Sequence, residues 1–161
     1  NGSAGGLVGF DRDRQLCREI TSATGARATT SSLALVDQFR RTGVKRFAMA
    51  TLNPPDLNET IAGSFAAEGF ELVASTQRSD IADNFAMAAV PPEDIAERAR
   101  RCVHESAARP DALIIYGTNT RGATITASLS RELGMPVYDS VAWGMMGAFR
   151  EINVDVGPLL V

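Results

Sequence analysis

The segment from Asp111 to Leu133 constrains the fold of this chain more than any other stretch. It reads DALIIYGTNTRGATITASLSREL, in which a continuous apolar run is followed by a polar turn and then by an amphipathic segment. An unbroken apolar run of this length is typical of a strand that helices cover on both faces. We therefore predict a strand over 112–116, a turn beginning at Gly117 and a helix over 121–133, as in an α/β protein.

The turn places hydroxyl and amide groups directly after that strand. Its residues are Thr118, Asn119, Thr120 and Arg121, and ligands of open α/β sheets bind outside the carboxyl ends of the strands. Thr118 or Asn119 can cap the next helix, whose free backbone N–H groups would face an anion. The alternative is a capped strand–helix turn that binds nothing. The pattern thus indicates where a site would lie, not its chemistry.

The rest of the chain repeats the alternation of strand and helix. Strands are predicted at 27–30, 46–51, 70–76 and 136–139, and helices at 10–23, 32–42, 54–68, 91–106 and 141–151. Residues 1–9 are too rich in glycine for a regular element, and 78–90 is predicted as a loop with a short helical turn. Strict alternation with short connections predicts a parallel sheet with right-handed crossovers and helices on both faces.

Polar residues follow the other predicted strands as well. Ser31, Asn53 and Asn84 take the same place as Thr118, just beyond a strand. Because the carboxyl ends of parallel strands meet at one edge of a sheet, we expect these four residues to converge there. Hydroxyl, amide and backbone N–H donors suit a small carboxylate. They also stabilise the enolate that forms when a proton or CO₂ leaves the neighbouring carbon.

Composition and missing motifs exclude several classes of function. The net charge of −3 and the pI near 5.2 argue against a surface for nucleic acid or anionic membranes, and no apolar run is long enough to cross a bilayer. Two cysteines make no disulfide framework, so a reducing cytoplasm is expected. Cys17 and Cys102 both fall on apolar helix stripes and His104 on a helix surface, so neither a metal site nor a Ser–His–acid set is predicted. The Walker and GxGxxG phosphate loops are absent, which disfavours a nucleotide-binding domain.

Six blocks of the sequence together resemble the aspartate/glutamate racemase superfamily, and within it the branch of maleate isomerases and arylmalonate decarboxylases. The blocks are GSAGGLVGFDR, ATTSSLALVDQFRRTGVKRFAMAT, PPDLNE, IADN, LIIYGTNTRG and LGMPVYDS, and the resemblance runs from about Asn1 to Leu160. The resemblance implies a fold of two pseudo-symmetric α/β lobes with the active site between them. It also implies no cofactor, and catalysis by one or two cysteines.

The resemblance divides the chain into three parts. Residues 1–26 would be a remnant of the first lobe, 27–138 the complete second lobe, and 139–161 a return helix and tail that pack on the first lobe. The expected fold is therefore a parallel four-stranded Rossmann-like sheet flanked by helices, the second lobe of a racemase-type fold whose first lobe is incomplete in this chain.

The resemblance also suggests site residues. The first family cysteine would lie just upstream of Asn1, and the second falls on Gly117, which can act as neither acid nor base. Ser3 matches a carboxylate-binding position, Asn84 matches an asparagine that contacts substrate in maleate isomerases, and Asn53 stands where a tyrosine is common. No catalytic residue is therefore assigned within the chain. The expected substrate-binding residues are Asn1, Ser3, Asn53, Asn84, Gly117, Thr118 and Asn119.

Two functional hypotheses follow. The first is a cofactor-independent isomerase, racemase or decarboxylase for a small carboxylic or dicarboxylic acid, using a cysteine upstream of Asn1 that would add to a double bond or protonate an enolate. Residues 1–161 alone would then be inactive. The second is a non-catalytic carboxylate-binding protein of the same fold, motivated by Gly117. The expected partner is a small carboxylate, with no nucleic acid and no membrane, and a homo-oligomer stays open.

Overall fold

A four-stranded parallel sheet forms the centre of the computed structural model, which describes residues 2–78, 80 and 83–154. The sheet order is β2-β1-β3-β4, and every neighbouring pair is parallel. The predicted parallel four-stranded α/β sheet is confirmed. The strands are β1 (Arg46–Thr51), β2 (Glu71–Ser75), β3 (Ala112–Tyr116) and β4 (Val137–Asp139).

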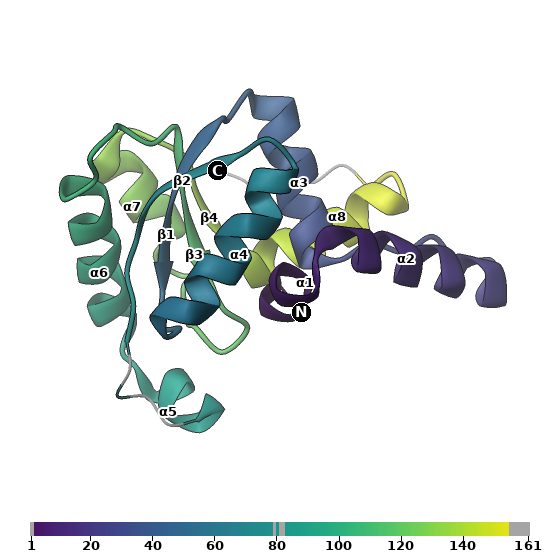
Figure 1. Cartoon of the computed structure of the whole chain (residues 1–161), viewed down its shortest axis with the longest axis horizontal. Helices are drawn as coiled ribbons and strands as arrows, with labels where there is room; N and C mark the ends of the chain where they lie inside the picture. The colour runs from purple at the N-terminus through teal and green to yellow at the C-terminus, as the bar shows by residue number, and fades with distance from the viewer. Residues whose placement is uncertain (1, 79, 81–82, 155–161) are drawn as a thin grey trace.

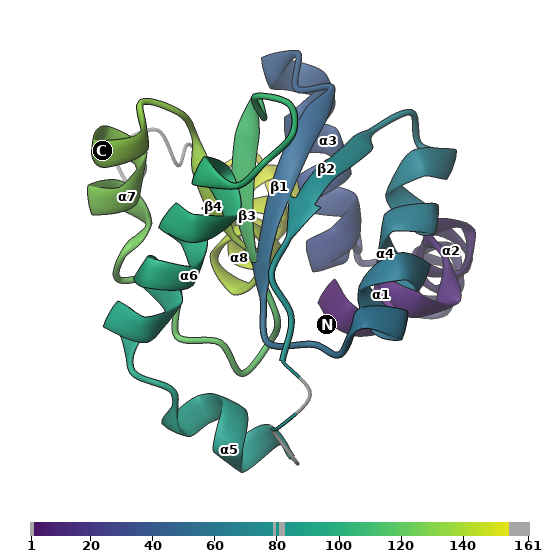
Figure 2. The same cartoon turned by 60° about the vertical axis from the view of Figure 1, so that its left-hand side comes forward.

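Helices cover both faces of this sheet (Figures 1 and 2). On one face lie α1 (Gly2–Val8), α3 (Ser31–Thr42), α4 (Pro55–Ala67) and α8 (Ser140–Glu151), and on the other lie α6 (Pro92–His104) and α7 (Thr126–Leu133). The remaining helices, α2 (Phe10–Thr24) and α5 (Asn84–Ala89), extend from the two ends of the molecule.

The alternation of side chains along β1 explains the two layers. Phe47 and Met49 enter the core beneath α3 and α4, whereas Ala48 and Ala50 face α6, because successive strand residues point to opposite sides. All four are at most 1% exposed. β3 is buried along its whole length as well, as its continuous apolar run predicts.

Two sequence predictions near the start of the chain are wrong. Residues 2–8 form helix α1 rather than a loop. A Cβ at Gly5 would lie 2.4 Å from Asp13 Oδ2, and one at Gly6 would lie 2.7 Å from the Tyr116 hydroxyl. Glycine lowers helix propensity, but here it allows α1 to lie directly against α2 and β3, so tertiary packing decides the local structure.

The second wrong prediction is a strand over 27–30, which is an irregular connection in the structure. This segment pairs with none of the four strands of the sheet. Thr30 instead caps α3, because its hydroxyl accepts a hydrogen bond from the Leu33 backbone N–H at 3.2 Å.

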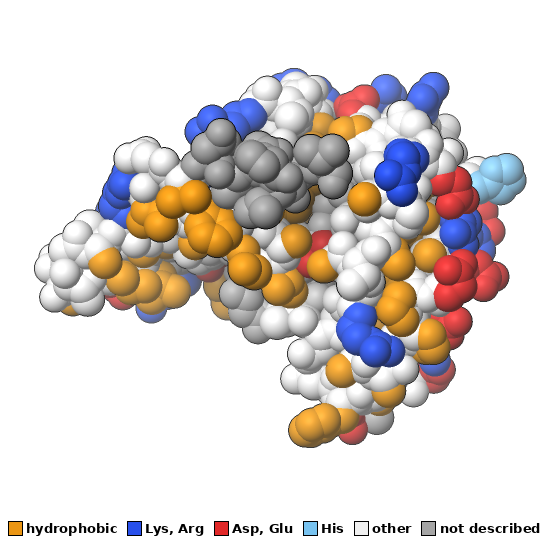
Figure 3. Space-filling view, turned by 180° about the vertical axis from the view of Figure 1, so that it is seen from behind, with side chains coloured by type: hydrophobic (Ala, Val, Ile, Leu, Met, Phe, Trp, Pro, Cys, Tyr) orange, Lys and Arg blue, Asp and Glu red, His pale blue; other side chains and the backbone are white. Residues whose placement is uncertain are grey.

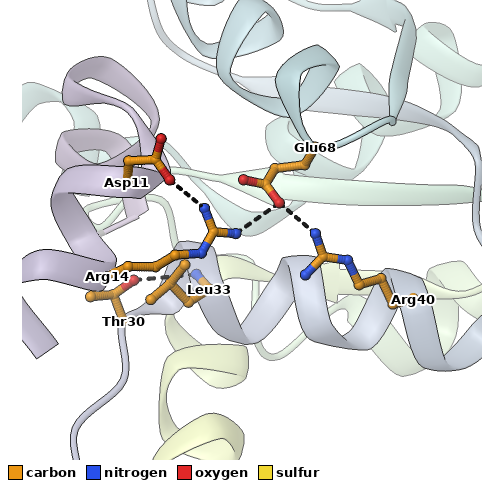
Figure 4. A network of polar contacts seen from close by, with 6 residues as sticks. All are labelled: Asp11, Arg14, Thr30, Leu33, Arg40 and Glu68. Carbon is orange, nitrogen blue, oxygen red and sulfur yellow. Dashed lines mark hydrogen bonds and ion pairs between the residues drawn. The ribbon is translucent and has the colours of Figure 1, made fainter. Parts of the chain in front are cut away.

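Helix α2 is anchored at its beginning and projects beyond the sheet (Figure 1). Phe10 and Asp13 are its buried residues, whereas Leu16 and Ile20 are 42% and 39% exposed. Arg14 ties the first turns to α4 and α3 by pairing with Glu68 at 2.8 Å, and Arg40 meets the same carboxylate (Figure 4). The apolar stripe predicted from the sequence is therefore real, but most of it is uncovered.

Among the described residues, no helix is long and apolar enough to cross a membrane.

Candidate functional site

The turn from β3 to α7 is longer than the sequence predicts. Gly117 has φ of +150°, a conformation that side chains rarely adopt. Two successive tight turns follow, closed by the N–H of Thr120 to the Gly117 carbonyl at 3.2 Å and by Gly122 to the Thr120 carbonyl at 2.9 Å. Helix α7 begins only at Thr126, with Ile125 at its N-cap. The helix start at 121 and the capping role of Thr118 or Asn119 are therefore wrong predictions.

The end of β4 supports this turn from the adjacent strand. Ser140 is 1% exposed, and its hydroxyl accepts a hydrogen bond from the Gly117 N–H at 3.2 Å. Asp139 caps α8 through Oδ1, which accepts the N–H groups of Val141 and Ala142, both at 2.9 Å. Its Oδ2 has no partner among the described residues. Burial raises the pKa of this carboxyl above its usual range.

A groove of about 870 Å³ opens beside these residues. Its polar wall includes Ser31, Thr118 and Ser140, and its apolar wall comes from α2 and α8, including Leu16 and Met145. The space-filling view from behind shows hydrophobic side chains gathered on this α2–α8 side (Figure 3). The groove thus brings together Ser31 and Thr118, which are more than eighty positions apart in the sequence. This agrees with the prediction that polar residues after the strands meet at one edge of the sheet.

Asn53 lies at the same edge of the sheet. Thr51 of β1 pairs with Tyr116 of β3 at the carboxyl ends of the two strands. Asn53 and Thr118 each follow their strand's paired residue by two positions. Asn53 is 5% exposed; its N–H donates to the Thr51 hydroxyl at 3.1 Å, and its side-chain Nδ2 has no partner among the described residues. A buried amide donor without a partner is costly, which marks it as a candidate for a ligand oxygen.

The other sequence-derived site residues lie elsewhere or outside the description. Asn84 begins α5, is exposed, and stands on a helix that extends away from the sheet beyond the carboxyl ends of the strands (Figure 2). The groove residues do not include it. Asn1 lies outside the described residues, and of Ser3 only the backbone, within α1, is described. Asn119 is half-buried in the turn beside Thr118.

Two polar contacts lie where α2, the start of α3 and the end of β3 come together. The Thr30 hydroxyl donates to Asp13 Oδ2 at 2.5 Å, and the hydroxyls of Ser32 and Tyr116 lie 3.5 Å apart. Burial raises the pKa of Tyr116 to about 12, so its phenol stays neutral near pH 7.

Sequence reasoning missed Thr30, Thr120, Asp139 and Ser140 as site residues. A signal for the last two was available, because Asp139 ends the predicted strand 136–139 and Ser140 directly follows it, as the other chosen residues follow theirs.

The two thiols do not reach this site in a reactive form. Cys102 is buried, and burial raises its pKa to about 11, so the neutral thiol persists. Cys17 is half-buried on α2, less covered than predicted, and its pKa is raised by desolvation. His104 is exposed, as predicted. Within the part of the chain that the structure describes, no group of histidine, cysteine and carboxylate residues could hold a metal ion.

The chain is similar to arylmalonate decarboxylases in sequence. The family model for arylmalonate decarboxylase matches residues 7–158. The arylmalonate decarboxylase of Bordetella bronchiseptica is 37% identical over 134 residues, which is 81% of this chain and 54% of the relative. The chain thus spans about half the length of this curated relative.

Solved structures of similar proteins have the same fold as this chain. An arylmalonate decarboxylase variant in a liganded form is 28% identical, with a TM-score of 0.85 over 92% of this chain and 63% of that one. A maleate cis-trans isomerase variant from Nocardia farcinica, with a covalently bound succinylcysteine intermediate, is 23% identical, with a TM-score of 0.83 over 96% of this chain and 64% of that one. At this identity the isomerase shows the fold alone.

Proposed function

The chain belongs to the arylmalonate decarboxylase family, and from this premise we propose that the full-length protein is a cofactor-independent enzyme acting on a small dicarboxylic acid. Decarboxylation of a malonate-type acid is the reaction we place first, and cis–trans isomerisation or racemisation of a small acid comes second. The observation that carries the proposal is the meeting of hydroxyl and amide donors from separate loops, Ser31, Asn53, Thr118 and Ser140, at one edge of the sheet.

These donors suit both the acid and the intermediate that it forms. Asn53 Nδ2, a buried donor without a described partner, would bind one carboxylate oxygen, and Thr118 and Asn119 would bind another. When CO₂ leaves a malonate, the electron pair of the broken C–C bond passes into the remaining carboxylate as an enediolate. Fixed donors hold that added charge more strongly than they hold the starting acid, which accelerates the reaction.

The proton donor to the resulting carbanion is, in our proposal, a cysteine of the full-length protein that precedes residue 1. Gly117 offers no side chain for this role, and Cys102 is buried with a raised pKa. A thiol that follows a strand and precedes α1 would face the N-terminus of a helix, which lowers the thiol pKa and so makes it a stronger proton donor. A reducing cytoplasm, the compartment we propose, would keep such a thiol reduced.

We also propose the division into 1–26, 27–138 and 139–161, of which 155–161 lie outside the described residues. The strands β1 to β3, the helices between the strands and all of β4 except Asp139 fall in the second part. The exposed side chains Leu16 and Ile20 of α2 and Met145 of α8 are then the surface on which the rest of the family fold packs.

The test is turnover by the full-length protein, including the residues upstream of Asn1. We expect release of CO₂ from phenylmalonate or an alkylmalonate, followed in a coupled bicarbonate assay, and a loss of kcat/KM when Asn53 is changed to Ala. Maleate, followed by its ultraviolet absorbance, tests isomerisation. Turnover of none of these acids would reject the enzymatic proposal.

A non-catalytic carboxylate-binding protein is the second candidate, favoured by the glycine at 117. It predicts that phenylmalonate or maleate raises the thermal unfolding midpoint while no product forms over prolonged incubation.

A further inference from the structure

The space beside Gly117 where a side chain would stand is filled by a different residue. A Cβ added at Gly117 would lie 2.6 Å from the hydroxyl oxygen of Thr120. The φ of +150° already disfavours any side chain at this position. The turn therefore places one polar group there, the Thr120 hydroxyl, and its backbone leaves room for no second one.

This hydroxyl makes no hydrogen bond within the described part of the chain. Thr120 is 6% exposed, and its backbone N–H and carbonyl are both used within the turn. Its side-chain oxygen is nevertheless not among the fully buried atoms that lack a partner, so it keeps contact with solvent. A largely buried side chain whose hydroxyl stays accessible and unpaired can donate to a ligand atom without breaking an existing bond.

A cavity lies in front of it. This open cavity of about 370 Å³ is lined by the 118–124 turn, Asp139 and the start of α6, with Thr118 and Thr120 both in its wall. Thr118 also lines the larger groove, so the Thr120 hydroxyl borders the same region as the donors assigned above. The volume is ample for a carboxylate group.

We propose that Thr120 is a further substrate-binding residue, whose hydroxyl donates a hydrogen bond to a carboxylate oxygen of the acid and to the same oxygen in the enediolate. The inference rests on the proposed function. Thr120 keeps its proton, so no group is transferred, and the effect is to stabilise negative charge at a fixed position. Gly117 is its necessary companion, because a side chain at 117 would displace the hydroxyl.

The decisive comparison is between Thr120→Val, which keeps the shape and removes the hydroxyl, and Thr120→Ser, which keeps the hydroxyl. In the full-length protein with phenylmalonate, we expect Thr120→Val to lower kcat/KM by about 10²-fold, the effect typical of removing one oxyanion donor. The kcat/KM of Thr120→Ser should stay within about threefold of the wild-type value, because the donor is kept. Thr60→Val is the matched control, because Thr60 is exposed on α4 and donates only to the Asp56 carbonyl.

Thermal unfolding separates binding from a purely structural role. Without ligand, Thr120→Val should unfold near the wild-type midpoint, because the hydroxyl that it removes makes no hydrogen bond within the described residues. With phenylmalonate, its stabilisation should be smaller than that of wild type or Thr120→Ser. Wild-type kcat/KM in the Val variant, or equal losses in Val and Ser, would overturn the inference.

The role of Thr120 in binding can be tested even if the proposed enzymatic function is wrong. If wild type turns over no acid, the same thermal series decides the inference by binding alone. Stabilisation by phenylmalonate or maleate that Thr120→Ser retains and Thr120→Val loses supports the donor, and stabilisation of all three proteins alike, or of none, rejects it.

Discussion

The sheet and helix α2 are both rich in apolar side chains, but they are covered to very different extents. In β1 and β3 the side chains at positions such as Phe47 and Ile114 are fully buried between helices, whereas Leu16 and Ile20 on α2 remain about two-fifths exposed. The amphipathic pattern of α2 is the same kind of signal that places the strands. The difference shows that such a pattern specifies which face is to be buried, while only the surrounding chain determines whether burial occurs.

Because the core beside the sheet is fully buried and α2 is not, substitutions in that core should cause the largest loss of stability. Phe65 of α4 is fully buried and contacts the rings of Phe10 and Phe47, with centroids 5.0 and 4.8 Å apart. Phe65→Ala should reduce the free energy of unfolding by about 3–5 kcal/mol, because it leaves a cavity in a packed core. Urea denaturation measures the loss, and a loss below about 1 kcal/mol would contradict the role given to this layer.

A smaller effect is expected at the rim of the sheet, at Asp139. Asp139→Ala removes the cap of α8 and should cost about 0.5–2 kcal/mol. Asp139→Asn keeps an oxygen for the cap and removes the charge. Because the folded-state pKa of Asp139 is raised, its favourable contribution is present below the unfolded pKa and is lost as the pH rises through the folded pKa.

The stability of Asp139→Asn relative to wild type should therefore increase as the pH rises from about 4 through the folded pKa of this carboxyl. Unfolding curves of the two proteins over that range test the sign. A relative stability that falls with rising pH would show that the buried carboxylate is satisfied in the folded protein.

Glu68 connects the two regions and should contribute less. It pairs with Arg14 of α2 and Arg40 of α3 (Figure 4), and the side-chain hydrogen bond from Arg14 is the main cause of its lowered pKa. Glu68→Gln should cost about 1 kcal/mol or less, because the arginines are partly exposed. The stabilisation is present above the unfolded pKa and is lost as the pH falls through the folded pKa.

Unfolding of wild type and Glu68→Gln at pH 7 and pH 3 checks this sign. We expect the difference between them to shrink at the lower pH. A difference that is unchanged would assign the effect to packing rather than to charge.

The smallest effect is expected on the exposed stripe of α2. Ile20→Ser should change the stability of residues 1–161 by no more than about 0.5 kcal/mol, as for other exposed positions. In the full-length protein the same change should cost clearly more if the rest of the fold covers this face. Equal small effects in both proteins would reject the division at residue 26.

The sequence predicted the sheet well because a strand buried on both faces leaves a continuous apolar run. Residues 46–51 and 112–116 are strands with the predicted bounds. The prediction for 27–30 failed because extended backbone becomes a strand only where it lies along another strand, and this segment pairs with none of the four. The prediction for residues 2–8 failed because their glycines allow close packing against Asp13 and Tyr116. Local helix propensity does not include this tertiary contact.

Prediction of the site was similarly partial. The polar turns at Ser31, Asn53 and Thr118 were identified from their place after predicted strands, and the structure places Ser31 and Thr118 in one groove with Asn53 at the same edge. Thr120 was missed because its place beside Gly117 depends on the backbone conformation of the turn. Asp139 was missed although it ends a predicted strand, and the burial of its Oδ2 without a partner among the described residues depends on how distant segments pack.

By itself, the sequence determined the order of elements, the parallel sheet and the edge at which polar groups collect, because hydrophobic periodicity and turn residues are local signals. Only the tertiary structure decided that Gly5 and Gly6 would lie inside a helix and that α2 would keep its apolar face exposed. Each of these depends on which distant surface comes within a few ångströms, and that is fixed only when the whole chain packs.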